Sequence, residues 1–166
     1  MSRYASGDLS AFDALYARYE SPIYGFCVRL LGDRDAAADA FQDTFITLVD
    51  TRSSYRPRGR FRSWLFTIAR NACLDQLRRG QRQARLLELY RPSIDDSTPS
   101  MARSVESRDE LARLLSPLST EQREILLLHR YHGFSYAEIA HMTNSTEPAV
   151  KQKAYRALMS LRGRRG

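Results

Sequence analysis

Residues 135–161 read SYAEIAHMTNSTEPAVKQKAYRALMSL, and this stretch predicts two short helices joined by a turn. Ser135 and Glu138 have the spacing of a capping box, so the first helix is expected to cover residues 136–142. The polar residues 143–145 supply the turn. Apolar residues then recur at helical spacing to the end of the stretch, which indicates a helix-turn-helix.

The second helix of this pair is predicted to begin at Glu147 and Pro148, because proline suits the first turn of a helix. A helix fits the major groove of B-DNA, where cations neutralise phosphates and polar side chains reach base edges. Two isolated cations would more often belong to a solvated surface, but the capped helix and turn before them favour DNA binding. The predicted contact residues are Lys151, Gln152, Tyr155 and Arg156.

Two further helices are predicted just upstream. Ser119 and Gln122 repeat the capping-box spacing, which indicates a helix that continues toward Tyr131 and ends at Gly133. A shorter apolar repeat at residues 111–115 predicts one more helix before it.

The charge distribution divides the chain. The formal net charge is +7. Lys and Arg outnumber Asp and Glu by 14 to 9 in residues 1–85 and by 9 to 4 in residues 111–166. In residues 86–110 the order is reversed, with 3 basic against 6 acidic residues. Such basic modules favour a polyanionic partner. The proline- and serine-containing acidic segment is typical of a linker. The predicted divisions are a domain at 8–85, a linker at 86–105 and a second domain at 106–163.

The N-terminal module also shows helical periodicity. Helices are expected at residues 12–30, as a pair that breaks at Pro22, at 36–49, and at 61 to about 79. Gly32 is placed to stop one helix and Asp33 to cap the next. The predicted fold class is therefore all-α, with two small helical domains joined by a flexible linker.

A basic, aromatic segment lies between Asp50 and Asp75, where the sequence has no acidic residue. Arginines can follow a nucleic-acid backbone, and aromatic faces stack unpaired bases for about 1 to 3 kcal/mol each, so this mixture suits single-stranded DNA. Trp64 and Leu65 are expected mainly in the core, and Arg70 could be solvated.

Other clusters are ambiguous. Asp35, Asp39 and Asp43 form one negative stripe, for which a solvated surface and a protein-docking face are equally consistent; a metal site ranks well behind. His129 and His132 lack a third ligand for zinc. The two cysteines, Cys27 and Cys73, are expected to be buried free thiols.

Several classes of protein are disfavoured. No apolar run approaches the roughly 20 residues that span a bilayer, and the N-terminus lacks a secretory signal, so a cytoplasmic protein without membrane insertion is expected. No nucleophile, base and orienting group occur together. We expect no cofactor, no metal, no small-molecule substrate and no enzymatic activity.

Three motifs in order resemble the extracytoplasmic-function (group IV) sigma factors of RNA polymerase: DAFQDTF at 39–45, FRSWLFTIARN at 61–71 and SYAEIA at 135–140. The resemblance covers nearly the whole chain. It implies a factor that binds core RNA polymerase, directs it to promoter DNA and promotes melting, and that is commonly held by an anti-sigma factor.

The resemblance also assigns roles to residues. It implies contacts with the melted minus-ten strand for Arg56, Arg58, Arg60, Phe61, Arg62, Asn71, Arg78 and Arg79. It implies polymerase docking for Asp39, Gln42, Asp43 and Phe45, and minus-thirty-five recognition for the last helix. Leu158 departs from the family's frequent arginine, which removes one expected phosphate contact, and Thr143 and Pro148 also differ. The alternatives are a duplex-binding regulator without polymerase and a nuclease that uses Asp39 and Asp43.

Overall fold

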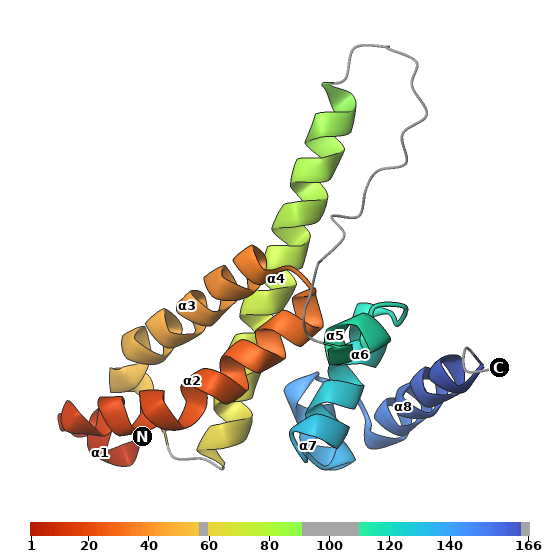
Figure 1. The fold of residues 1–166 in the computed structure, drawn as a ribbon. Helices are drawn as coiled ribbons and strands as arrows, with labels where there is room; N and C mark the ends of the chain where they lie inside the picture. The colour runs from red at the N-terminus through yellow and green to blue at the C-terminus, as the bar shows by residue number, and fades with distance from the viewer. Residues whose placement is uncertain (57–59, 91–109, 164–166) are drawn as a thin grey trace.

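The computed structural model describes residues 1–56, 60–90 and 110–163, and every regular element in these ranges is helical. The N-terminal domain holds α1 (Ser2–Ala5), α2 (Ser10–Leu31), α3 (Arg34–Asp50), a 3-10 turn (Arg52–Ser54) and α4 (Phe61–Leu89). The C-terminal domain holds α5 (Glu110–Leu115), α6 (Thr120–Leu126), a π-helical segment (Leu127–Tyr131), α7 (Tyr136–Met142) and α8 (Glu147–Arg162). The all-α, two-domain prediction is confirmed (Figure 1).

In the N-terminal domain, α2 and α3 lie side by side against the first half of α4 (Figure 1). Gly32 ends α2 with a φ of 71°, and the Asp33 side chain accepts from the backbone N–H groups of Asp35 and Ala36 at the start of α3. Both helix-boundary predictions are therefore confirmed. The short α1 was not predicted; its Tyr4 side chain is buried.

The predicted break at Pro22 is wrong, because α2 runs through it as one helix of 22 residues. Proline removes one helical hydrogen bond and crowds the carbonyl four residues earlier. Of the residues that follow, Ile23, Phe26 and Leu30 are fully buried. This packing offsets the local cost of the proline.

Replacing Pro22 by alanine should therefore raise the free energy of unfolding by about 1 to 3 kcal/mol, because the missing N–H is restored and the ring clash removed. Urea unfolding followed by circular dichroism measures the change. The neighbouring exposed Ser21, changed to alanine, is the control and should shift it by no more than about 0.5 kcal/mol. A loss of stability in Pro22→Ala would instead show that proline's restriction of the unfolded chain dominates.

Helix α4 is longer than predicted, since it continues past Arg79 to Leu89. Its last part extends away from the body of the molecule, and residues 80–90 are all exposed (Figure 1). The sequence there is rich in Arg, Gln, Ala and Leu, which are good helix formers, and they tolerate the single Gly80. The start of the predicted linker at residue 86 thus falls within α4, and residues 91–105 lie outside the described residues.

The C-terminal domain follows its predicted helix signals. Both capping boxes, at Ser119 and Ser135, are present. The turn after α7 places Asn144, not Thr143, in the left-handed region, with a φ of 51°. Asparagine tolerates that conformation better than most residues, which explains how the turn forms without glycine.

The two domains pack against each other through one continuous cluster of buried apolar residues. Phe66 of α4 lies 5.2 Å from Phe134 and 4.6 Å from His132, measured between ring centroids. Arg123 of α6 donates to the Leu30 carbonyl at 2.7 Å. The C-terminal domain is therefore anchored on α2 and α4 by both apolar and polar contacts.

Candidate nucleic-acid and polymerase interfaces

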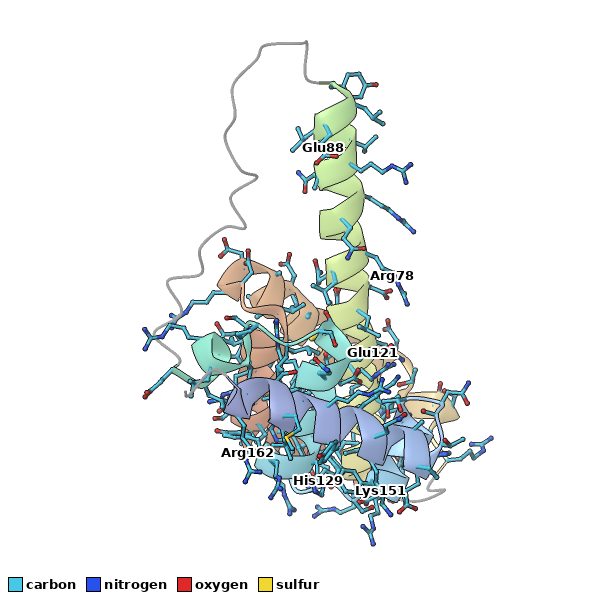
Figure 2. All side chains as sticks on the ribbon, turned by 90° about the vertical axis from the view of Figure 1, so that its right-hand side faces the viewer. Arg78, Glu88, Glu121, His129, Lys151 and Arg162 are labelled. Carbon is cyan, nitrogen blue, oxygen red and sulfur yellow. The ribbon has the colours of Figure 1, made fainter. Side chains whose placement is uncertain are left out.

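Helix α8 presents the predicted minus-thirty-five contact residues on one exposed face. The Thr146 side chain caps the helix, and Val150, Ala154 and Ala157 bury the opposite face. Tyr155 is 62% exposed, and Lys151 pairs with Glu147 at 2.7 Å. Figure 2 shows this helix along the near side of the molecule, with Lys151 toward one end. The exposed residues of this face are Lys151, Gln152, Tyr155 and Arg156.

Some of the arginines around the start of α4 contact other residues of the protein. Arg56 is exposed, and Arg58 lies outside the described residues. Arg60 forms an ion pair with Glu138 of α7 at 2.6 Å. Arg62 donates to the His132 carbonyl, and its guanidinium carbon lies 4.4 Å from the Phe134 ring centroid. Two of the predicted strand-binding arginines thus contact the C-terminal domain.

Phe61 belongs to an aromatic cluster at the start of α4. Its ring centroid lies 5.5 Å from that of Tyr19 and 5.7 Å from that of Trp64. Tyr55 completes the cluster, and burial raises the pKa of its hydroxyl. Leu65 is fully buried and Trp64 half-buried, so the core prediction holds for Leu65 and only in part for Trp64.

Further along α4, three predicted contact residues are exposed. Asn71 accepts from Arg70 at 3.3 Å, Arg78 pairs with Asp75 at 2.7 Å, and Arg79 lies 3.9 Å from Asp43. Arg79 is separated from Phe61 by about 27 Å of helix, at 1.5 Å per residue. The structure therefore arranges these residues along one extended helix rather than in one pocket (Figure 2, Arg78).

The predicted docking residues lie on and beside an apolar groove of α2 and α3. Asp39 and Gln42 are exposed, whereas Phe45 is only 7% exposed and packs against Tyr16 and Phe41. The groove encloses about 530 Å³ and is lined by Phe12, Tyr16, Phe41, Gln42, Phe45, Ile46, Val49 and Asp50.

Sequence reasoning missed two residues of this groove. Ile46 is 50% exposed and Val49 44% exposed, although both are apolar. Each lies four residues after a predicted docking residue, Gln42 or Phe45, so helical spacing could have identified them. They give the acidic face an apolar centre.

Two buried titratable groups lie between the domains; Glu124 was missed by the sequence analysis, and His132 was considered there only as a zinc ligand. Glu124 of α6 is 2% exposed and pairs with Arg70; burial raises its carboxyl pKa, and Arg70 opposes the shift. Burial, together with the nearby Arg62 and Arg29, lowers the pKa of His132 to about 4. Glu124 lies in α6, whereas His132 directly follows the π-helical segment.

The remaining candidate residues form no reactive site in the described ranges. Cys27 and Cys73 are buried free thiols, as predicted, and the hydrogen bond between them raises the pKa of Cys73. His129 contacts the Phe134 carbonyl at 2.8 Å and stacks on Tyr136. In residues 1–56, 60–90 and 110–163, no three metal-ligating side chains converge, and no helix is long and apolar enough to cross a membrane.

Comparison with known proteins accounts for this arrangement. The family model for Sigma-70 region 2 matches residues 15–83, and that for Sigma-70, region 4 matches residues 108–161. The RNA polymerase sigma factor CarQ of Myxococcus xanthus is 32% identical over 98% of this chain and 93% of its own length. The ECF RNA polymerase sigma factor SigM of Bacillus subtilis is 28% identical over 90% of this chain and 92% of its own.

Two solved structures are similar over almost the whole chain. The sigma factor RpoE of Bartonella quintana, in complex with the anti-sigma factor NepR, has a TM-score of 0.75 and 25% identity, covering 93% of this chain and 96% of that one. CnrH, in complex with the cytosolic domain of CnrY, has a TM-score of 0.72 and 28% identity, covering 98% and 92%.

The two-domain fold and its exposed basic helices are those of a sigma-70 factor, and the chain belongs to the sigma-70 family. Within it the chain is of the extracytoplasmic-function type, which serves transcription initiation with RNA polymerase at promoters.

Proposed function

We propose that this sigma factor joins core RNA polymerase, places it on promoters with a minus-ten and a minus-thirty-five element, and promotes melting between them. The observation that supports this most is that the chain carries two faces, an exposed basic face on α8 and a second basic and aromatic face on α4. The working units are residues 8–85, a linker at 86–105 and residues 106–163.

The proposed division of labour follows from the chemistry of each face. Duplex contacts by Lys151, Gln152, Tyr155 and Arg156 position the complex. Arg56, Arg58, Arg60, Phe61, Arg62, Asn71, Arg78 and Arg79 bind the melted strand, and stacking of its unpaired bases offsets the few kcal/mol needed to unstack them. Catalysis belongs to the polymerase.

Strand binding competes with contacts between the domains. Arg60 and Arg62 bind Glu138 and the His132 carbonyl in this structure. A DNA phosphate must replace these acceptors, so we propose that the domains separate when the factor engages a promoter. An exposed ion pair such as Arg60–Glu138 contributes at most about 1 kcal/mol, so its exchange costs little.

Docking on the polymerase is assigned to Asp39, Gln42, Asp43 and Phe45, together with Ile46 and Val49. An apolar centre with a charged rim is the usual composition of a protein interface. Because the solved structure of RpoE is a complex with the anti-sigma factor NepR, and that of CnrH is a complex with the cytosolic domain of CnrY, we also propose an anti-sigma partner and a cytoplasmic location.

The test is transcription with sigma-free core polymerase, genomic DNA fragments and the full chain, with start sites read by sequencing. Discrete starts that share an upstream two-part element are expected. Ile46→Asp should abolish them by disrupting docking, whereas Leu9→Asp, at another exposed apolar residue that lies outside the groove, should not. Absence of starts, despite tight duplex binding by the protein alone, would favour a regulator that works without polymerase.

Arg156 offers a separate test of promoter reading. Its replacement by alanine should weaken binding to a specific duplex site by about 1 to 3 kcal/mol, since an arginine contact to a base edge or phosphate is lost. Fluorescence anisotropy of polymerase-bound factor on labelled promoter DNA measures this. Arg162→Ala, at the C-terminal end of α8 (Figure 2), is the matched control. Equal losses of affinity in both variants would show that Arg156 contributes only its positive charge and no specific contact.

A further inference from the structure

A cleft of about 590 Å³ lies between the N-terminal domain and the π-helical segment of the C-terminal domain. One wall comes from α2 and the start of α3, through Arg18, Tyr24, Arg29 and Arg34. The other comes from Tyr131 and His132. The cleft therefore exists only while the two domains are packed together, and of its charged residues only Arg62 has a role assigned above.

Among the described residues, the charged side chains that line this cleft are all arginines. They are Arg18, Arg29, Arg34 and Arg62. The guanidinium carbon of Arg29 lies 4.3 Å from the Tyr131 ring centroid, and that of Arg18 lies 5.8 Å from the Tyr19 ring. Such contacts with aromatic rings help to orient a guanidinium. The cleft is thus a concave region of concentrated positive potential.

The floor of the cleft contains a second polar feature. His132 is 6% exposed, and its Nε2 has no hydrogen-bond partner among the described residues. A buried polar atom without a partner costs free energy comparable to a lost hydrogen bond. The Nε2 of a neutral imidazole donates or accepts according to its tautomer, so a ligand with both kinds of group can supply the partner. The low pKa of His132, about 4, agrees with the positive surroundings.

We propose that this cleft binds a small phosphorylated ligand of the pyrophosphate class. Arginine forks match phosphate oxygens in geometry and charge, and the volume lies within the range of small-molecule sites. Tyr24 and Tyr131 add aromatic surface beside the arginines, which suits a nucleobase attached to the phosphates. A bound ligand bridges the domains and favours their packed arrangement.

The test is isothermal titration of the full chain with inorganic pyrophosphate, and separately with ADP, at 0.15 M salt, about physiological ionic strength. Saturable binding of pyrophosphate is expected; tighter binding of ADP would identify the aromatic wall as a base site, and equal binding a phosphate site alone. The double variant Arg18→Gln with Arg34→Gln should weaken binding by about tenfold or more, because two charge-assisted hydrogen bonds are lost.

Arg82→Gln with Arg85→Gln is the matched control, since it removes the same charge from the exposed end of α4 outside the cleft. Equal weakening in both double variants, no binding at millimolar pyrophosphate, or tighter binding of an acidic peptide would each overturn the proposal. Because the titration needs neither polymerase nor promoter, its outcome is independent of the transcription assay.

Discussion

Phe66→Ala is expected to lower the free energy of unfolding by about 3 to 5 kcal/mol, the range for a buried phenylalanine replaced by alanine. The Phe66 side chain is fully buried, and its ring centroid lies 5.6 Å from that of Phe26. On its other side it contacts Phe134 and His132 of the C-terminal domain. The substitution therefore opens a cavity at the point where the two domains share their core.

Urea unfolding measures the loss, and amide hydrogen exchange tests its location. Exchange should accelerate in α2 and α4 and also in the π-helical segment, because Phe66 contacts both domains. Tyr90→Ala is the control, since that ring is 82% exposed at the end of α4 and should change stability by no more than about 0.5 kcal/mol. A loss below about 1 kcal/mol for Phe66→Ala would show that the domain contact is not part of the cooperative fold.

Lowering the pH from 6.5 to 4 is expected to cost the protein about 3 kcal/mol of stability through His132 alone. The pKa of His132 is about 4 in the folded chain against 6.5 for the free side chain, so in this window the unfolded chain binds a proton that the folded chain does not. This penalty is absent well above pH 6.5 and grows as the pH falls toward 4. Arg62 and Arg29 face the ring and disfavour its charged form.

The measurement is the free energy of unfolding of the natural chain and of His132→Leu across this pH range. On acidification, the free energy of unfolding of the natural chain should fall relative to that of His132→Leu by about 1.4 kcal/mol per pH unit. Glu124, whose pKa is raised, is common to both proteins, so it cancels in the difference. His141→Asn, at an exposed histidine, should leave the pH profile unchanged; a parallel profile for His132→Leu would contradict the assignment.

Much of the local structure was predictable because its causes are local in sequence. The boxes at Ser119 and Ser135 and the stop at Gly32 each satisfy backbone groups within a few residues of themselves. The apolar period of α8 fixed which side chains face solvent, and it placed Lys151 and Arg156 on the outer face. The predictions that were wrong have causes in tertiary packing. The break predicted at Pro22 does not occur, because residues beyond it are buried and keep α2 continuous.

By itself, the sequence determined most of the helices, their order, the two basic modules and the motifs of the family, since these depend on residue type and on spacing along the chain. Only the tertiary structure decided that Arg60 and Arg62 contact the C-terminal domain, and that Ile46 and Val49 line a groove. It also brought arginines of α2, α3 and α4 to one cleft beside His132. Such juxtapositions depend on how residues distant in sequence pack, which no local periodicity specifies.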